Sequence, residues 1–170
     1  SDATHRRSLT SFAQSARSMN SITFEEYLGR YGTLTYKNVG VSMLPLIRQG
    51  RDAFILRAVK PGETLKKWDV VLYKRPPDAY VLHRIIDVKD GTYDILGDNC
   101  VAVERNIPKE RVIGVMTGFI RKNKEYAVAD KRYRIYVTLR CKPYHVRTAF
   151  KRIWMLIKRV GRTVLKSFAK

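Results

Sequence analysis

The stretch Gly40-Val41-Ser42-Met43-Leu44-Pro45-Leu46-Ile47 joins a polar, strand-like segment to a turn signal at Gln49-Gly50. Gly40 permits a close backbone approach or an unusual dihedral angle, and Pro45 fixes its own φ and disfavours helix at the residue before it. A serine in such a rigid turn can hold its hydroxyl at a fixed place, as a nucleophile must. The same residues also suit a buried turn in which Ser42 bonds the backbone. The rest of the chain has to decide between these two interpretations.

The composition indicates a folded, strongly basic protein. The chain has 170 residues, 45% of them hydrophobic, which is enough for one domain with a real core. Its net charge of +19 indicates an anionic partner, either nucleic acid or acidic lipid. Cys100 and Cys141 are too few for a disulfide scaffold, and two free thiols are the simpler interpretation. None of the three histidines has a second ligand at metal-site spacing, so we predict no metal site and no cofactor.

Runs of β-forming residues separated by turn signals predict a mostly β domain. Asp90-Gly91 lies between two alternating runs and is a strong signal for a two-residue hairpin. The spacing of the runs favours a mainly antiparallel barrel or folded sheet. The expected strands cover residues 34–39, 53–57, 69–74, 80–88, 92–96, 112–121, 125–128 and 133–139.

Helical patterns flank this β region on both sides. Thr23 and Glu26 form a capping box that predicts a short helix over 21–30, ended by Gly29 or Gly32. Residues 147–168 place large apolar residues on one side of a helix and Lys and Arg on the other. We therefore divide the chain into a flexible basic arm (1–20), a β-rich domain (21–141) and a basic amphipathic C-terminal helix (142–170).

A serine nucleophile needs a base, and His83 is the best candidate in the chain. It lies in the expected strand Tyr80-Val81-Leu82-His83-Arg84-Ile85-Ile86, which would hold its imidazole rigidly. A carboxylate should orient that imidazole. Asp98 follows a glycine in a tight turn and Glu104 comes six residues later. An ordinary structural role is also open for each acid: an Asx turn for Asp98, and a solvated ion pair with Arg105 or Lys109 for Glu104.

Taken together, five segments resemble the S24/S26 serine peptidase superfamily, and in particular the signal peptidases of the S26 family. The blocks follow one another at compatible spacing from about Gly40 to Phe119. They are Ser42-Met43-x-Pro45, Trp68-Asp69-Val70-Val71-Leu72-Tyr73, Val81-Leu82-His83-Arg84-Ile85-Ile86, Gly97-Asp98-Asn99 and Val112-Ile113-Gly114-Val115.

The resemblance implies a β-rich signal-peptidase-like fold and an acyl-enzyme mechanism with Ser42 as nucleophile. Bacterial signal peptidases and self-cleaving repressors use lysine as the base. A histidine at position 83 is instead similar to the archaeal and endoplasmic-reticulum type, in which an acid after the Gly-Asp-Asn box completes the site. That position falls on Glu104, which we favour, with Asp98 kept as the alternative. The implied substrate is a leader or signal-type peptide with small residues near the cleavage site.

Two positions beside the nucleophile bear on how such a site would work. Signal peptidases often have serine two residues before the nucleophile, and this chain has Gly40. The oxyanion would then depend on backbone N–H groups, notably that of Ser42. We expect Met43 and Pro45, the other residues of the first block, to contact the substrate.

The sequence lacks the transmembrane anchor that signal peptidases usually carry, because no segment approaches ~18 consecutive apolar residues. We expect a cytoplasmic protein, with peripheral membrane association through residues 147–170 on anionic lipid. The alternative for this helix is to pack its apolar side on the β domain. No nucleic-acid reading motif is visible, so we expect no specific nucleic-acid partner. The rival function is a non-catalytic membrane- or nucleic-acid-binding module on a peptidase scaffold.

Overall fold

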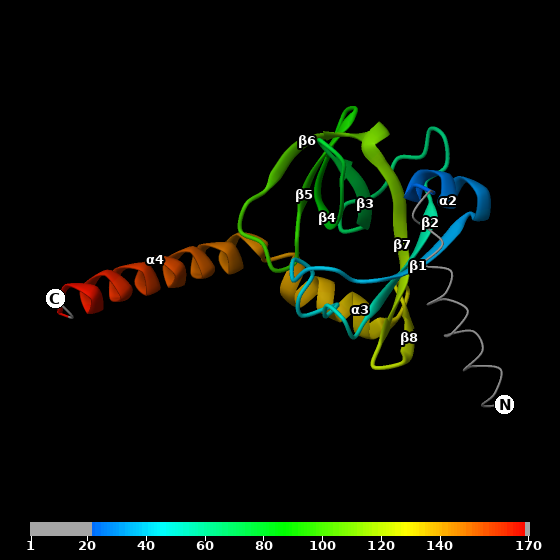
Figure 1. The fold of residues 1–170 in the computed structure, drawn as a ribbon. Helices are drawn as coiled ribbons and strands as arrows, with labels where there is room; N and C mark the ends of the chain where they lie inside the picture. The colour runs from blue at the N-terminus through cyan, green and yellow to red at the C-terminus, as the bar shows by residue number, and fades with distance from the viewer. Residues whose placement is uncertain (1–21, 169–170) are drawn as a thin grey trace.

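The computed structural model describes residues 22–168, and the predicted arm over 1–20 lies outside them (Figure 1). One antiparallel sheet of eight strands forms the body, with a short helix before it and a long helix after it. This confirms the predicted mostly β class with its two flanking helices. The elements are α2 (Phe24–Tyr31), β1 (Thr33–Lys37), β2 (Ala53–Ala58), β3 (Val70–Arg75), β4 (Ala79–Lys89), β5 (Thr92–Leu96), β6 (Glu104–Pro108), η1 (Lys109–Arg111), β7 (Val112–Arg121), β8 (Lys124–Ala127), α3 (Lys131–Tyr136), η2 (Val137–Cys141) and α4 (Tyr144–Phe168).

The strands follow the order β1-β2-β7-β3-β4-β5-β6, and β8 pairs with β7 outside this path. Asp90 and Gly91 connect β4 to β5, where Lys89 faces Thr92, so the predicted hairpin is confirmed. β1 and β6 are the two ends of the path. β1 leads into the turn that carries Ser42, and β6 begins at Glu104. Both edge strands therefore adjoin residues of the predicted site.

The predicted N-terminal helix is confirmed together with its caps. Thr23 accepts from the backbone N–H of Glu26, and the Glu26 carboxylate accepts from the N–H of Thr23. Gly32 ends the helix with a φ of 72°, a left-handed conformation that favours glycine. The buried Leu28 anchors α2 to the body.

Two predicted elements differ from the structure. The expected strand over 133–139 is wrong, because this segment forms α3 and the π-helical η2. Tyr133, Val137 and Cys141 are buried at a spacing of four, which is a helical period rather than an alternation. The short edge strand β6 was not predicted, because its polar residues give no apolar alternation.

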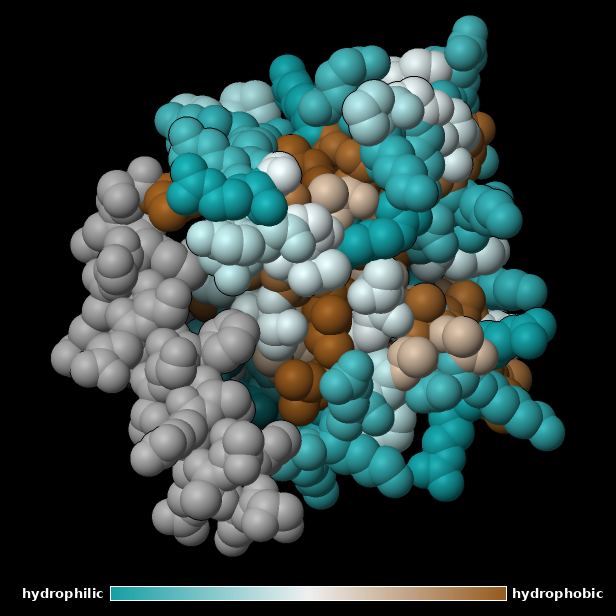
Figure 2. Space-filling model, turned by 90° about the vertical axis from the view of Figure 1, so that its right-hand side faces the viewer, coloured by the Kyte–Doolittle hydropathy of each residue, from teal (hydrophilic) through white to brown (hydrophobic). Residues whose placement is uncertain are grey.

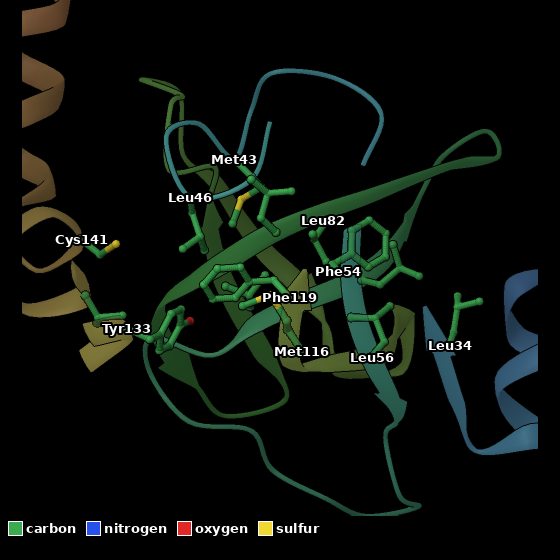
Figure 3. Packing of buried hydrophobic residues seen from close by; sticks show 14 of the residues in the cluster. Leu34, Met43, Leu46, Phe54, Leu56, Leu82, Met116, Phe119, Tyr133 and Cys141 are labelled. Atoms are coloured by element: carbon green, nitrogen blue, oxygen red, sulfur yellow. The ribbon is translucent and has the colours of Figure 1, made fainter. Parts of the chain in front are cut away.

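The central strands are buried on both faces, and each face supports its own hydrophobic cluster. Along β3, Val70 and Leu72 belong to the larger cluster, while Val71 and Tyr73 belong to the other. Successive side chains of a strand point to opposite faces, which produces this division. Figure 3 shows the larger cluster, in which Met43 and Leu46 of the turn lie over side chains of the sheet, and Tyr133 of α3 belongs to the same cluster.

The C-terminal helix α4 extends away from the β body (Figure 1). Among the described residues, no helix is both long and apolar enough to cross a membrane. On the face of the body seen in Figure 2, apolar areas alternate with hydrophilic side chains.

Candidate functional site

The turn that carries Ser42 is held firmly by the hydrophobic core. Met43, Leu46 and Ile47 are at most 3% exposed and pack in the larger cluster. Gly40 has a φ of 94°, in the region that side chains rarely adopt, so the predicted special role of this glycine is confirmed for its backbone. The Asn38 amide donates to the Gly40 carbonyl at 2.9 Å. The path of the chain up to Ser42 is thus fixed from both sides.

A second loop holds the same turn from across the site. The backbone N–H of Asn99 donates to the Ser42 carbonyl at 2.7 Å, and the Asn99 side-chain amide donates to the Val41 carbonyl at 3.1 Å. Asn99 belongs to the Gly97-Asp98-Asn99 segment that follows β5. These two bonds bring together residues more than fifty positions apart in the sequence.

His83 lies on β4, where it faces Val71 of β3, and is only 5% exposed. Its Nδ1 lies 3.2 Å from Oε1 of Glu104, although the contact lacks the geometry of a hydrogen bond. Its Nε2 lies 4.0 Å from the Cys100 thiol. One ring nitrogen therefore adjoins the predicted acid, and the other points toward the loop that holds Ser42.

Gly97 is the point where these groups meet. A Cβ added at Gly97 would lie 2.9 Å from His83 Nε2, 2.9 Å from the Ser42 carbonyl oxygen and 2.7 Å from the Cys100 thiol. All three distances are shorter than normal contacts with a Cβ. The absence of a side chain at position 97 lets the imidazole approach the main chain of Ser42.

The structure thus brings Ser42, His83 and Glu104 into one neighbourhood. No hydrogen bond joins Ser42 Oγ to His83 within residues 22–160, whose side chains the structure describes. Contacts of this kind are often loose in a site without substrate and tighten in the complex.

Glu104 is also held in place by two residues of β3, Arg75 and Tyr73. Arg75 on β3 donates to both of its carboxylate oxygens, with Nε at 2.9 Å from Oε2, and the Tyr73 hydroxyl also bonds this carboxylate. Burial opposes the charged form, but these hydrogen bonds outweigh it and hold the pKa of Glu104 below its usual value. Glu104 is consequently ionised at neutral pH.

The environment of His83 favours the neutral imidazole. Burial lowers its pKa below the ordinary value, Glu104 counteracts this effect, and the charge of Arg75 adds to it. A neutral imidazole at neutral pH can accept a proton from a serine hydroxyl. Its buried position also excludes bulk water from the nitrogen that adjoins Glu104.

Asp98, the alternative acid, binds Arg84 and Tyr136 and not His83. Arg84 binds its two oxygens from Nε and Nη2 at 2.8 and 2.7 Å, and both residues are at most 3% exposed. Tyr136 donates to the same carboxylate at 2.9 Å. Burial raises its pKa, but the Arg84 charge and hydrogen bonds bring the net value below the usual range. Asp98 therefore holds the loop to the core and does not contact His83.

The remaining predicted site residues occupy different positions. Met43 is fully buried, so the predicted contact of its side chain with substrate does not fit the structure, since the side chain is needed in the core. Pro45 is exposed, and its place beside the site agrees with a substrate contact. Within the described residues, the Ser42 N–H donates to no protein acceptor.

Two residues that shape the site, Arg75 and Lys151, were not predicted from the sequence, and neither was the contact made by Asn99. Arg75 clamps Glu104, Asn99 holds the Ser42 turn, and Lys151 of α4 donates to the Asn99 side-chain oxygen at 2.7 Å and to the Asn99 carbonyl. The Gly-Asp-Asn segment was visible in the sequence, but the partner of its asparagine was not. Nothing in the local pattern around Arg75 or Lys151 indicates a distant acceptor.

The described residues contain no group of three or more His, Cys, Asp or Glu side chains that could hold a metal ion. Cys100 and Cys141 are free thiols, as expected. No protein-family model matches the chain, and neither the curated proteins nor the solved structures gave a match.

Proposed function

We propose that the chain is a serine endopeptidase with a signal-peptidase-like fold, in which Ser42, His83 and Glu104 form the catalytic triad. The observation that carries this proposal is the position of His83. One nitrogen of its ring lies 3.2 Å from the ionised Glu104, and the other points to the turn of Ser42. Acyl transfer by a serine needs a base that lies between the orienting acid and the nucleophile, and this position of His83 supports that arrangement.

In this mechanism His83 Nε2 takes the proton of the Ser42 hydroxyl as Ser42 Oγ attacks the peptide carbonyl. Glu104, fixed by Arg75, orients the ring and stabilises the imidazolium that forms. The proton then passes to the leaving amine, which departs and leaves an acyl-enzyme. Water attacks the acyl group with His83 again as base, and Ser42 is regenerated.

The oxyanion of the tetrahedral intermediate needs donors that are not already used. The Ser42 N–H has no acceptor within the described chain, and Gly40 presents no side chain that would supply a second donor. We assign the Ser42 N–H to the oxyanion. The substrate would lie extended along an edge strand, β1 or β6, because within residues 22–168 each of them pairs with only one strand and adjoins the site.

The proposal is tested by cleavage of leader-type peptides that have small residues at the cleavage position and two positions before it. Products are identified by mass spectrometry, which gives the cleaved bond. The Ser42→Ala variant should lose cleavage while its circular dichroism and urea midpoint stay those of the parent chain. His83→Gln should lose cleavage as well. Full activity in the Ser42→Ala variant would refute the assignment, and so would the absence of cleavage by the parent chain across a library of such peptides.

A further inference from the structure

The long helix α4 exposes a continuous apolar side. At 100° per residue six of its large apolar residues fall on one side of the helix, and each of these six is more than half exposed, whereas Met155 lies on the other side. They are Phe150, Ile153, Trp154, Leu156, Ile157 and Val160, with exposures from 54% to 71%. The expected alternative, in which this side packs on the β domain, is therefore not what the structure shows. The helix also lies outside the range of the family resemblance.

The opposite side of α4 is basic and faces the body. Arg147 donates to the carbonyls of Asp98 and Cys100, Lys151 to that of Asn99, and Arg152 to that of Val101 at 3.0 Å. Helical geometry places Lys158 on this same side. In these first turns of α4 the basic side contacts the domain and the apolar side points away from it.

The charge of α4 favours anionic lipid over a second copy of the chain as the surface that covers its apolar side. Its sequence contains no Asp or Glu from Tyr144 to Phe168. Two copies packed through their apolar sides would bring basic flanks together without a counter-charge. Anionic lipid headgroups supply that counter-charge, while the acyl boundary takes the apolar side chains.

We propose that α4 docks this protein on an anionic phospholipid bilayer. The helix lies in the interface with its apolar side in the acyl boundary, and the β body sits on its other side, away from the lipid. The Lys158 ammonium lies 5.1 Å from the centre of the Trp154 ring, at the border of the apolar side, so its long side chain reaches the headgroups. The helix lies on the membrane and does not cross it.

Docking through α4 has a consequence for the site, and this consequence rests on the proposed function. The first turns of α4 hold residues 98–101, and Asn99 in that loop holds the Ser42 turn. A bilayer under α4 would thus keep the nucleophile near the lipid surface, where peptides leaving or lying on a membrane are found. Lipid binding itself does not depend on whether the site is active.

The test measures co-sedimentation of the full chain with vesicles, once with phosphatidylglycerol mixed into phosphatidylcholine and once with phosphatidylcholine alone. The decisive variant is Ile153→Ser with Ile157→Ser, which removes two exposed residues of α4 one turn apart. The matched control is Ile135→Ser with Leu139→Ser, which removes two exposed residues at the same spacing from α3 and η2. In both variants two large apolar side chains become serine, so general effects on solubility are equal.

The full chain should bind the anionic vesicles and not the neutral ones, and high salt should weaken binding because it screens the headgroup charge. The α4 variant should bind about tenfold more weakly or worse, since apolar burial drives insertion. The control should stay within about twofold of the parent. Absence of binding to anionic vesicles, or equal losses in the two variants, would overturn the proposal. A dimer in sedimentation equilibrium that the α4 variant abolishes, without vesicle binding by the parent, would show that a second copy covers this side.

Discussion

The carboxylates of Asp98 and Glu104, only six residues apart in the sequence, have different partners and different surroundings in the structure. Asp98 is buried with Arg84 and makes no contact with His83, whereas Glu104 is half-buried and lies beside the His83 ring. Asp98 ties its loop to α3 and η2 through Tyr136 and Cys141. Glu104 is fixed by Arg75 at the edge of the sheet. Two acids that look equivalent in the sequence thus stabilise two different parts of the molecule.

The separation has its origin in one strand. His83 and Arg84 are consecutive residues of β4, so their side chains point to opposite faces of the sheet. The loop after β5 places Asp98 against Arg84, whereas Glu104, the first residue of β6, lies beside His83 on the other face. The face with Arg84 belongs to the larger core, and the face with His83 adjoins the Ser42 turn. The role of each acid therefore depends on the β4 residue that it contacts, which is Arg84 for Asp98 and His83 for Glu104.

The largest effect is expected from Asp98→Ala. This change leaves the buried Arg84 guanidinium without its counter-charge, so the free energy of unfolding should fall by about 3–5 kcal/mol. Urea denaturation measures it, with Asp98→Asn as the milder variant because it keeps an acceptor. An unfolding free energy within about 1 kcal/mol of the parent would show that Arg84 does not need this partner.

Next in size is the effect of Glu104→Gln, which should fall on activity and leave stability almost intact. The amide removes the charge that stabilises the His83 imidazolium, so kcat/KM should fall by about 10²-fold or more. The partly exposed pair of Arg75 and Glu104 adds about 1 kcal/mol or less to stability. Peptide cleavage and urea denaturation of the same samples separate the two quantities. If Asp98→Asn lost the same activity with no loss of stability, the roles of the two acids would have to be exchanged.

The pH dependence of cleavage should show a smaller effect, a shift of the pH midpoint whose direction the charges of the site determine. His83 must be neutral to act as a base, and burial lowers its pKa, so activity should rise with pH through a midpoint below about 6.5. Removing a negative charge in Glu104→Gln should move this midpoint to lower pH. Removing a positive charge in Arg75→Met should move it to higher pH. Midpoints of the kcat/KM profile that move in the same direction in both variants would contradict the arrangement.

Asp98 should show a different pH effect, on stability alone. Its pKa is lowered in the folded protein, so its stabilisation is complete above the unfolded value near 3.9 and is lost as the pH falls through the folded value. The parent chain should lose more stability than Asp98→Asn between about pH 5 and pH 2. Parallel curves of unfolding free energy for the two proteins would exclude this contribution.

The smallest effect is expected from the link between α4 and the site. Lys151→Met removes the donors that hold Asn99 but keeps the length of the side chain, and kcat should fall by about tenfold without vesicles present. Lys158→Met, on the same side of α4 but beside Trp154, is the matched control and should leave kcat unchanged. Because Lys151 acts through Asn99 and Ser42, KM should change less than kcat. Equal kcat values for the two variants would show that α4 does not position the site.

Much of the fold could be predicted from local pattern. The capping box of Thr23 and Glu26, the Asp90-Gly91 hairpin and the strand that contains His83 all depend on neighbours in the sequence, and all are confirmed. The segment 133–139 was misassigned because its buried residues recur every four positions among β-branched and aromatic residues that also suit a strand. β6 escaped detection because an edge strand needs no apolar alternation.

The site could be predicted only in part. Ser42, His83 and the two acids were found because they stand in short motifs, and Gly40 because of its backbone. The choice between Asp98 and Glu104 requires knowing which face of β4 each acid reaches, and that depends on pairing across the sheet. The clamp from Arg75 and the contacts of Lys151 with Asn99 join segments far apart in the chain, so no local pattern contains them.

The most direct test of the central claim is labelling with a fluorophosphonate probe, which reacts with an activated serine, followed by peptide mapping. We expect a single adduct on Ser42 of the parent chain, at a rate that rises with pH through the His83 midpoint. We expect no adduct in Ser42→Ala and a strongly slowed reaction in His83→Gln and Glu104→Gln. A parent chain that stays unlabelled, or a His83→Gln variant that is labelled as fast as the parent, would contradict the assignment of Ser42 and His83.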